Sequence, residues 1–272
     1  MDPLADLKTC ERDASLLTGL GVNVLQVSYY DSTQSHAPCL DAFAAAGIYI
    51  FVRLDLGSYF ENHDGIRWSE RVFSRLSGAI DSLANHTNVL ALSVGRYPNN
   101  QPLPSIHIIR AAIRDLKRHV RDKGLREMPI GYTASPYSAI RKDVALENQF
   151  RNVLDLMGCS ETRADFVALA MGPEVKNNCT STETIDFLAR VVASSSIPVF
   201  ATDTGCMLNK NLTSAISNSF DDRQYGYISR IFSAEIALAF NGVVVREFYY
   251  TNLTDTGWFG SCFMPPTAMM KF

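Results

Sequence analysis

The sequence predicts an α/β protein that forms a single (β/α)8 barrel of the TIM type, and three observations support this. Strand-like and helix-like segments alternate along the whole chain, which is typical of parallel strands joined by crossover helices. The chain has 272 residues, of which 47% are hydrophobic and 19% charged, and such barrels run to roughly 250 residues. There are no repeats, low-complexity tracts or linkers, so one domain is expected.

The first half of the chain shows the alternation clearly. Gly19, Gly21 and Gly47 end two of the helical patterns. The apolar run 48–54 predicts a strand covered on both faces. The next helix places its apolar side chains on one stripe. The expected elements are helix 4–20, strand 23–30, helix 39–46, strand 48–54, helix 68–83 and strand 89–95.

The second half continues the pattern with a basic amphipathic helix over 105–123, whose charged side chains we interpret as a solvated face. Then come strand 129–133, helix 140–150, strand 165–171, helix 181–194, strand 197–203, helix 224–240 and strand 242–250. This gives seven strands, each preceded by a helix. A barrel needs eight, so we expect the first strand to be missing, with a gap between the second and the eighth. The expected domains are a barrel over 1–255 and a C-terminal tail over 256–272.

Composition excludes several classes of function. A net charge of −3 and a pI of about 6.0 argue against nucleic acid or an anionic membrane as the main partner. No apolar run approaches the ~20 residues of a transmembrane segment. Six cysteines and four glycosylation sequons favour the secretory route over the alternative of free thiols and chance sequons. No signal peptide follows Met1, so a secreted protein would have its leader outside this chain. The sequons begin at Asn85, Asn178, Asn211 and Asn252.

Short motifs run in register from residue 2 to about residue 250. They include Asp2-Pro3-Leu4-Ala5-Asp6, Cys10-Glu11-Arg12-Asp13, Leu20-Gly21-Val22-Asn23, Ala46-Gly47-Ile48-Tyr49, Met128-Pro129-Ile130-Gly131-Tyr132, Arg163-Ala164-Asp165-Phe166, Ile197-Pro198-Val199-Phe200 and Gly205-Cys206. With these motifs the chain resembles glycoside hydrolase family 72, the fungal cell-wall β-1,3-glucanosyltransferases. The resemblance implies a TIM barrel that acts on β-1,3-glucan outside the cell without metal or other cofactor. Members usually carry a C-terminal lipid-anchor signal, which this chain does not show.

The six cysteines predict a disulfide framework, and no spacing among them suggests a zinc site. Sequence alone would allow fifteen pairings. The family resemblance implies two pairs and leaves a third. The pairs are Cys10 with Cys39, Cys179 with Cys206, and Cys159 with Cys262.

The resemblance also implies where two catalytic carboxyl groups belong. A retaining enzyme needs a nucleophile and an acid/base about 5 Å apart, at the C-terminal ends of barrel strands. The family's acid/base glutamate maps to Tyr97, after Arg96, and its nucleophile maps to Asp203. A phenol, whose pKa is about 10, is a poor acid/base. Losing the general acid/base glutamate costs about 10²–10⁴ in rate. The shorter Asp203 retracts its oxygen by about 1 Å, which can cost about 10²-fold.

Other positions at the expected mouth of the barrel differ from the family as well. The family's Arg-Val-Tyr on strand two is Gln26-Val27-Ser28, and its Tyr-Phe-Gln-Glu on strand eight is Glu247-Phe248-Tyr249-Tyr250. Glu247 could face Asp203, but we favour a structural ion pair of Glu247 with Arg246, Arg96 or Arg53. We expect a degenerate enzyme that retains β-1,3-glucan binding; the alternative is an active transglycosylase with Asp203 as nucleophile. The candidate substrate-binding residues are Arg96, Tyr132, Glu247, Tyr249 and Tyr250, for which ordinary packing is the competing interpretation.

Overall fold

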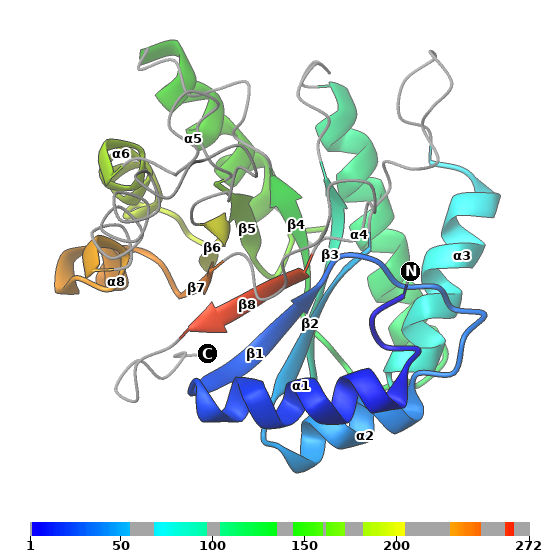
Figure 1. Ribbon diagram of the computed structural model, residues 1–272. Helices are drawn as coiled ribbons and strands as arrows, with labels where there is room; N and C mark the ends of the chain where they lie inside the picture. Colours follow the sequence, from blue (N-terminus) through cyan, green and yellow to red (C-terminus); the bar gives the residue numbers. More distant parts are fainter. Residues whose placement is uncertain are drawn as a thin grey trace, which may run out of the picture.

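The computed structural model describes residues 2–54, 68–96, 104–134, 144–159, 162–171, 182–204, 229–245 and 259–263. Strands in these ranges form a closed barrel in the order of the sequence, and helices lie around its outside (Figure 1). Seven neighbouring strands are parallel, as the alternation predicted. They are β1 (Val22–Val27), β2 (Tyr49–Leu54), β3 (Val89–Arg96), β4 (Ile130–Ala134), β5 (Val167–Ala170), β6 (Val199–Thr204) and β7 (Gly242–Val245).

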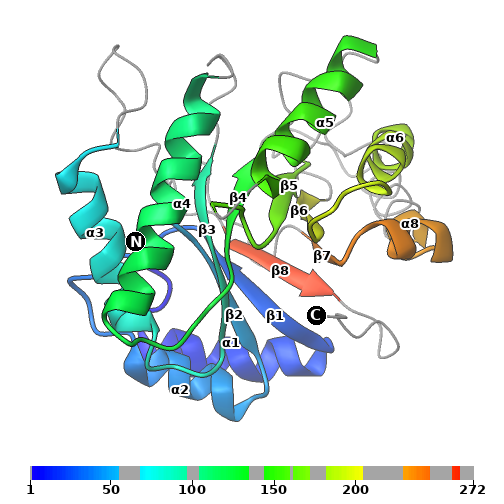
Figure 2. The same cartoon turned by 180° about the vertical axis from the view of Figure 1, so that it is seen from behind.

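The helices follow the strands around the barrel, and the view from behind shows α4 beside α3 on the outer surface (Figure 2). The helix preceding β1 and four of the six that lie between later strands are close to the predicted segments, whereas the helix before β5 runs past its predicted end at residue 150 and the helix before β7 covers part of the predicted helix 224–240. They are α1 (Leu7–Gly19), α2 (Ala37–Ala45), α3 (Glu70–Leu83), α4 (Pro104–Asp122), α5 (Val144–Gly158), α6 (Thr182–Val192) and α8 (Ala234–Ala239). Within the described ranges, no helix combines the length and the apolar character that a membrane crossing requires.

The barrel closes through an eighth strand that the sequence did not predict. β8 (Phe259–Phe263) pairs antiparallel with β1 along its length and with β7 at Val245 and Ser261. The expected gap beside β1 is therefore wrong, and part of the expected tail 256–272 belongs to the barrel. The physical reason is that β1 and β7 would otherwise present unpaired backbone N–H and C=O groups, which a further strand satisfies.

One predicted disulfide forms and one does not. Cys10 in α1 is bonded to Cys39 in α2, which confirms that pair and joins two helices that pack against each other. Cys159 is a free, exposed thiol just after α5, so its predicted pairing with Cys262 is wrong. Cys262 lies on β8, between β1 and β7, whereas the segment that follows α5 leads into β5, three strands away. The pair Cys179–Cys206 lies outside the described residues.

Two layers of apolar side chains build the core. The larger layer lies between the strands and the helices, where residues such as Val52, Leu92 and Ile113 are fully buried. A smaller cluster fills the inside of the barrel, and we call it the apolar floor: Val24, Phe51, Ala91, Phe166, Ala168, Phe200 and Val244. Gly131 makes room for it, since a Cβ at that position would lie 2.6 Å from the ring of Phe166.

Candidate active site

A layer of polar side chains lies inside the barrel above the apolar floor. Successive residues of a strand point to opposite faces, so the polar residues two places beyond Val24, Phe51, Ala91, Gly131 and Phe200 also point inward. All five are at most 2% exposed, and we call them the polar layer: Gln26, Arg53, Ser93, Thr133 and Thr202. They lie towards the C-terminal ends of the parallel strands, which is the face where barrels of this type place their active sites.

Asp203 joins the polar layer through a local distortion of β6. Strict alternation would direct its side chain outward, towards the helices, together with Val199 and Ala201. Instead Asp203 has a left-handed φ of 51°, and the pairing of β6 with β7 shifts register between Ala201 and Thr204. A bulge of this kind re-aims a side chain, and aspartate tolerates the left-handed region better than most residues. The carboxylate that the sequence assigned to the nucleophile position therefore reaches the barrel interior.

Inside the barrel, Asp203 forms a buried ion pair with Arg53. The Arg53 NH1 group donates to Oδ2 of Asp203 over 2.8 Å, and the two side chains are 2% and 11% exposed. Sequence reasoning considered Arg53 only as a partner for Glu247. The sequence does contain an indication of this ion pair, because a charged residue such as Arg53 within the apolar run 48–54 needs a buried partner.

Several atoms of the polar layer have no hydrogen-bond partner among the residues that the structure describes. They are both side-chain atoms of the Gln26 amide, Oγ1 of Thr202, Nε of Arg53 and, just beyond β1, Oγ of Ser28. By contrast, Thr133 donates from Oγ1 to Ser93 Oγ over 2.7 Å. An unsatisfied buried polar group costs about 1–3 kcal/mol. Amide and hydroxyl groups arranged in this way can bind the hydroxyl groups of a sugar.

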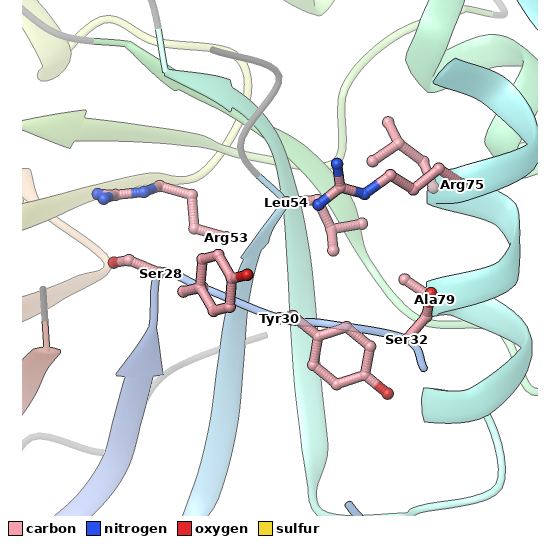
Figure 3. A pocket seen from close by; sticks show the side chains of 9 residues that line it. Ser28, Tyr30, Ser32, Arg53, Leu54, Arg75 and Ala79 are labelled. Carbon is pink, nitrogen blue, oxygen red and sulfur yellow. The ribbon is translucent and has the colours of Figure 1, made fainter. Parts of the chain in front are cut away.

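A small cavity opens where β1 and β2 end beside α3. It has a volume of about 30 Å³ and is lined by Ser28, Tyr30, Ser32, Arg53, Leu54 and Arg75, among others. Figure 3 shows Arg75 extending from α3 towards the strands, whereas the guanidinium of Arg53 points away from that helix. Burial lowers the pKa of Arg75 and raises that of Tyr30. The guanidinium groups of Arg53 and Arg75 thus point in different directions, so they cannot bind one anionic group together in this cavity.

The loop after β1, which forms one side of the cavity, is held by buried polar contacts. Tyr30 stacks on His36 with ring centroids 4.1 Å apart, and its hydroxyl is hydrogen-bonded to Ser82 Oγ on α3. His36 Nε2 lies 2.8 Å from Oδ2 of Asp2, which also accepts from the Asp31 backbone N–H. These contacts fix the mouth of the barrel on the β1 side.

Of the other predicted site residues, three lie within the described ranges and the rest lie outside them. Tyr132 is 3% exposed and packs in the layer between strands and helices, so its predicted place at the mouth is wrong; its neighbour Thr133 is the residue that points inward. Arg96 ends β3, opposite Thr133. Asn85 is exposed in the turn after α3. Outside the described residues lie Tyr97, Glu247, Tyr249, Tyr250, Asn178, Asn211 and Asn252.

Metal-ligating side chains do not cluster in the described part of the molecule. No three histidine, cysteine, aspartate or glutamate residues gather there in a group that could hold a metal ion. Among the described residues, the polar layer with Asp203 offers one carboxylate, one guanidinium and several uncharged hydrogen-bonding groups. It is suited to binding a neutral polyol.

Comparison with known proteins agrees with this geometry. A family model described as "Glucanosyltransferase" matches residues 1–257. The 1,3-beta-glucanosyltransferase PGA5 of Candida albicans is 28% identical over 92% of the chain, and 1,3-beta-glucanosyltransferase gas5 of Schizosaccharomyces pombe is 30% identical over 91%. The matched regions cover 38% and 48% of these relatives, so the chain spans less than half of their length.

Solved structures show the same barrel. Saccharomyces cerevisiae Gas2p in complex with laminaripentaose superposes with a TM-score of 0.72 at 25% identity, over 92% of this chain and 53% of that one. A mutant of the same yeast protein in complex with laminaritetraose and laminaripentaose gives a TM-score of 0.74 at 25% identity, over 94% of this chain and 54% of that one.

Proposed function

The chain belongs to the glucanosyltransferase family, and we propose that its barrel binds β-1,3-glucan at the C-terminal face but transfers glucan weakly or not at all. By resemblance to the family, its place of action is the fungal cell wall or the extracellular space. The observation that carries the proposal is the composition of the polar layer, in which Asp203 is the one carboxylate among the described residues and is already paired with Arg53.

Glucan binding is supported by the related structures and by the unpartnered polar atoms. Yeast Gas2p, with a barrel of the same fold, was solved with laminari-oligosaccharides. In this chain the amide of Gln26 and the hydroxyls of Thr202 and Ser28 offer both donors and acceptors at the mouth. Sugar hydroxyls have the same dual character. Binding of this kind does not require a pair of carboxyl groups.

Weak or absent transfer is supported by the chemistry that two-step retention demands. One carboxyl group must attack the anomeric carbon, while a second, about 5 Å away, first donates and then accepts a proton. By resemblance to the family, Asp203 maps to the sequence position of the first group, and Tyr97 maps to that of the second. A phenol cannot serve as the carboxylate base for the incoming acceptor at the pH of a cell wall. The expected loss is on the order of 10²–10⁴ in rate.

One observation favours the alternative of an active transglycosylase that uses Asp203 as nucleophile. A non-glycine residue with positive φ costs about 1–3 kcal/mol and persists where the surrounding structure enforces it, often at functional sites. Here the bulge at Asp203 turns a carboxylate into the barrel, and Arg53 orients it. Both features would suit a nucleophile.

The test of catalysis is incubation of the protein with reduced laminari-oligosaccharides, followed by mass analysis for elongated products. The proposal predicts no elongation by the wild-type chain, and a detectable gain in the double variant Tyr97→Glu/Asp203→Glu. The matched control is Tyr97→Gln/Asp203→Glu, which has the same size but lacks the acid/base and is expected to be inert. Elongation by the wild type that disappears in Asp203→Asn would instead establish the alternative.

The test of binding is a pull-down on insoluble β-1,3-glucan, with cellulose as the matched matrix. We expect retention on the first and not on the second. Gln26→Leu keeps the volume but removes an unsatisfied buried amide, so it should leave stability unchanged or raise it while weakening retention. Thr184→Val, on α6 outside the barrel interior, is the control and should bind as the wild type does. Equal retention of Gln26→Leu and wild type would show that the polar layer is not the glucan site.

A further inference from the structure

The outer face of α4 presents a row of arginines that the glucan site does not use. Arg114, Arg118 and Arg121 are exposed, and their spacing of four and three residues places them on one side of the helix. We call these three residues the arginine stripe. The opposite side of α4 is buried against the barrel through Ile109, Ile113 and other apolar residues, so the stripe faces outward.

The stripe is a local reversal of the charge of the molecule. Helix α4 contains five arginine or lysine residues and two aspartates, a formal charge of +3, whereas the whole chain carries −3. The residues outside α4 therefore carry −6. Such an asymmetry concentrates positive charge along one helix of a chain whose remaining residues are net negative.

Carboxylates on the protein balance only part of this charge. Arg114 donates from Nε to Oδ1 of Asp115 over 2.7 Å, but its side chain is still 47% exposed. The other oxygen of Asp115 accepts from the indole of Trp68. Lys117, beside the stripe, is paired with Asp165 over 2.6 Å and is 19% exposed. Of the arginine and lysine side chains that the structure describes on α4, the three arginines of the stripe are thus the exposed ones.

From this geometry we infer that the stripe is a docking surface for an acidic polysaccharide, a linear sugar chain with repeated carboxylate groups. At 1.5 Å per residue, the arginines follow one another at about 6 Å and about 4.5 Å along the axis, which is close to the length of one sugar ring. Guanidinium groups bind carboxylates in a planar, bidentate manner. A thin chain with one charge per ring can contact all three arginines at once.

Two other anionic partners fit the surface less well. A membrane surface is bound by a helix that has apolar side chains beside its cations, yet within the described ranges none of the exposed large hydrophobic residues lies on α3 or α4. Double-stranded DNA carries a charge every ~1.7 Å and is broad, so it would extend beyond α4 onto the rest of the chain, whose net charge is −6. The lack of exposed large hydrophobic residues on α3 and α4, together with the net negative charge outside α4, therefore favours a slender polyanion over a membrane or a DNA duplex.

The stripe also has a direction. Because α4 follows β3 and runs antiparallel to it, the helix begins near the mouth of the barrel and ends near its base (Figure 2). Arg110, one turn before the stripe, is held by the carbonyl of Cys159 and the hydroxyl of Thr162, which continues the basic face towards the mouth. An acidic chain on the stripe would run along the side of the barrel, apart from the glucan site.

The experiment is a titration of the protein with fluorescently labelled polygalacturonate at increasing salt concentrations. Three contacts to a single-stranded polyanion predict a slope of log K against log salt of about −2, and hence an electrostatic contribution of about a hundredfold at 0.1 M salt. We expect the triple variant Arg114→Gln/Arg118→Gln/Arg121→Gln to bind about a hundredfold more weakly at 0.1 M salt and to lose the salt dependence of its affinity. Substitutions of exposed surface residues usually change stability by no more than about 0.5 kcal/mol, so the variant should fold.

The matched control removes the same charge elsewhere: Lys8→Gln/Arg71→Gln/Arg190→Gln, three exposed cations on α1, α3 and α6. It should bind polygalacturonate as the wild type does, and neutral laminarin should not compete. Equal losses in both triple variants, or wild-type binding by the stripe variant, would overturn the inference. Tighter stripe-dependent binding of a DNA oligonucleotide or of phosphatidylserine vesicles would overturn the assignment of the partner.

Discussion

The ion pair between Arg53 and Asp203 allows a quantitative prediction, because its two charges are nearly shielded from water. Replacing Arg53 by methionine keeps most of the side-chain volume and leaves the Asp203 carboxylate buried without its partner. Asp203→Asn removes the other charge. The side chains are 2% and 11% exposed and their polar atoms are 2.8 Å apart. Removal of one partner from such a pair destabilises a protein by about 3–5 kcal/mol.

A double-mutant cycle measures how much of that loss belongs to the pair itself. For charge centres about 4 Å apart, with an effective dielectric constant of about 20, the interaction is about 4 kcal/mol. We therefore expect the double variant to be about 2–4 kcal/mol more stable than the sum of the single losses implies. The assay is urea unfolding followed by circular dichroism, with the slope m checked for constancy.

A small effect would refute this reasoning. Exposed ion pairs contribute about 0–1 kcal/mol, so single losses of that size with additive effects would mean that Arg53 and Asp203 are solvated rather than buried together. The same variants report on function: the proposed glucan contacts come from the uncharged groups of Gln26, Thr202 and Ser28, so glucan retention should survive in each variant of the ion pair that folds. Arg53→Met that folds but no longer binds β-1,3-glucan would place the guanidinium in the binding site itself.

Three further predictions concern stability. Cys10→Ser opens the disulfide between α1 and α2 and should lower the free energy of unfolding by about 2–4 kcal/mol, and a reducing agent should have the same effect on the wild type only. Gly131→Ala places a methyl group against the ring of Phe166 and should cost about 1–3 kcal/mol by overpacking, measured as a shift of the urea midpoint. The hydrogen bond from Arg114 lowers the pKa of Asp115. The ionised carboxylate therefore stabilises the fold above its unfolded pKa, near 3.9, and this contribution is lost as the pH falls through the lower pKa of the folded state. Asp115→Asn should be less stable than wild type at neutral pH, and the difference in stability should shrink in acid.

Much of the fold followed from the sequence because local patterns specify it. The continuous apolar run 48–54 and the amphipathic helix 105–123 lie close to β2 and α4. The strand β8 was missed for a physical reason. Nothing in residues 259–263 alone requires a strand, and its pairing arises from the open edges of β1 and β7, which exist only once the barrel has formed.

The site was harder to predict because its contacts join distant parts of the chain. Asp203 could be placed at the mouth through the family motif, but its partner Arg53 is 150 residues away and no local pattern connects them. Tyr132 was predicted at the mouth, but the inward-pointing position on β4 belongs to the next residue. A shift of one position exchanges the two faces of a strand, so Thr133 points inward and Tyr132 lies under the helices.

The stability of the barrel interior bears on whether the proposed binding site is in use, separately from catalysis. A barrel with no remaining ligand would gain stability by replacing Gln26 and Thr202 with apolar residues of similar size, because both keep buried polar atoms unpartnered within the described structure at about 1–3 kcal/mol each. It would also gain by relaxing the positive φ of Asp203. Both features weaken the fold, and both lie at the mouth rather than at the floor. We interpret their presence next to Arg53 as the feature that a barrel with a hydroxyl-rich ligand requires, whether or not it breaks a glycosidic bond.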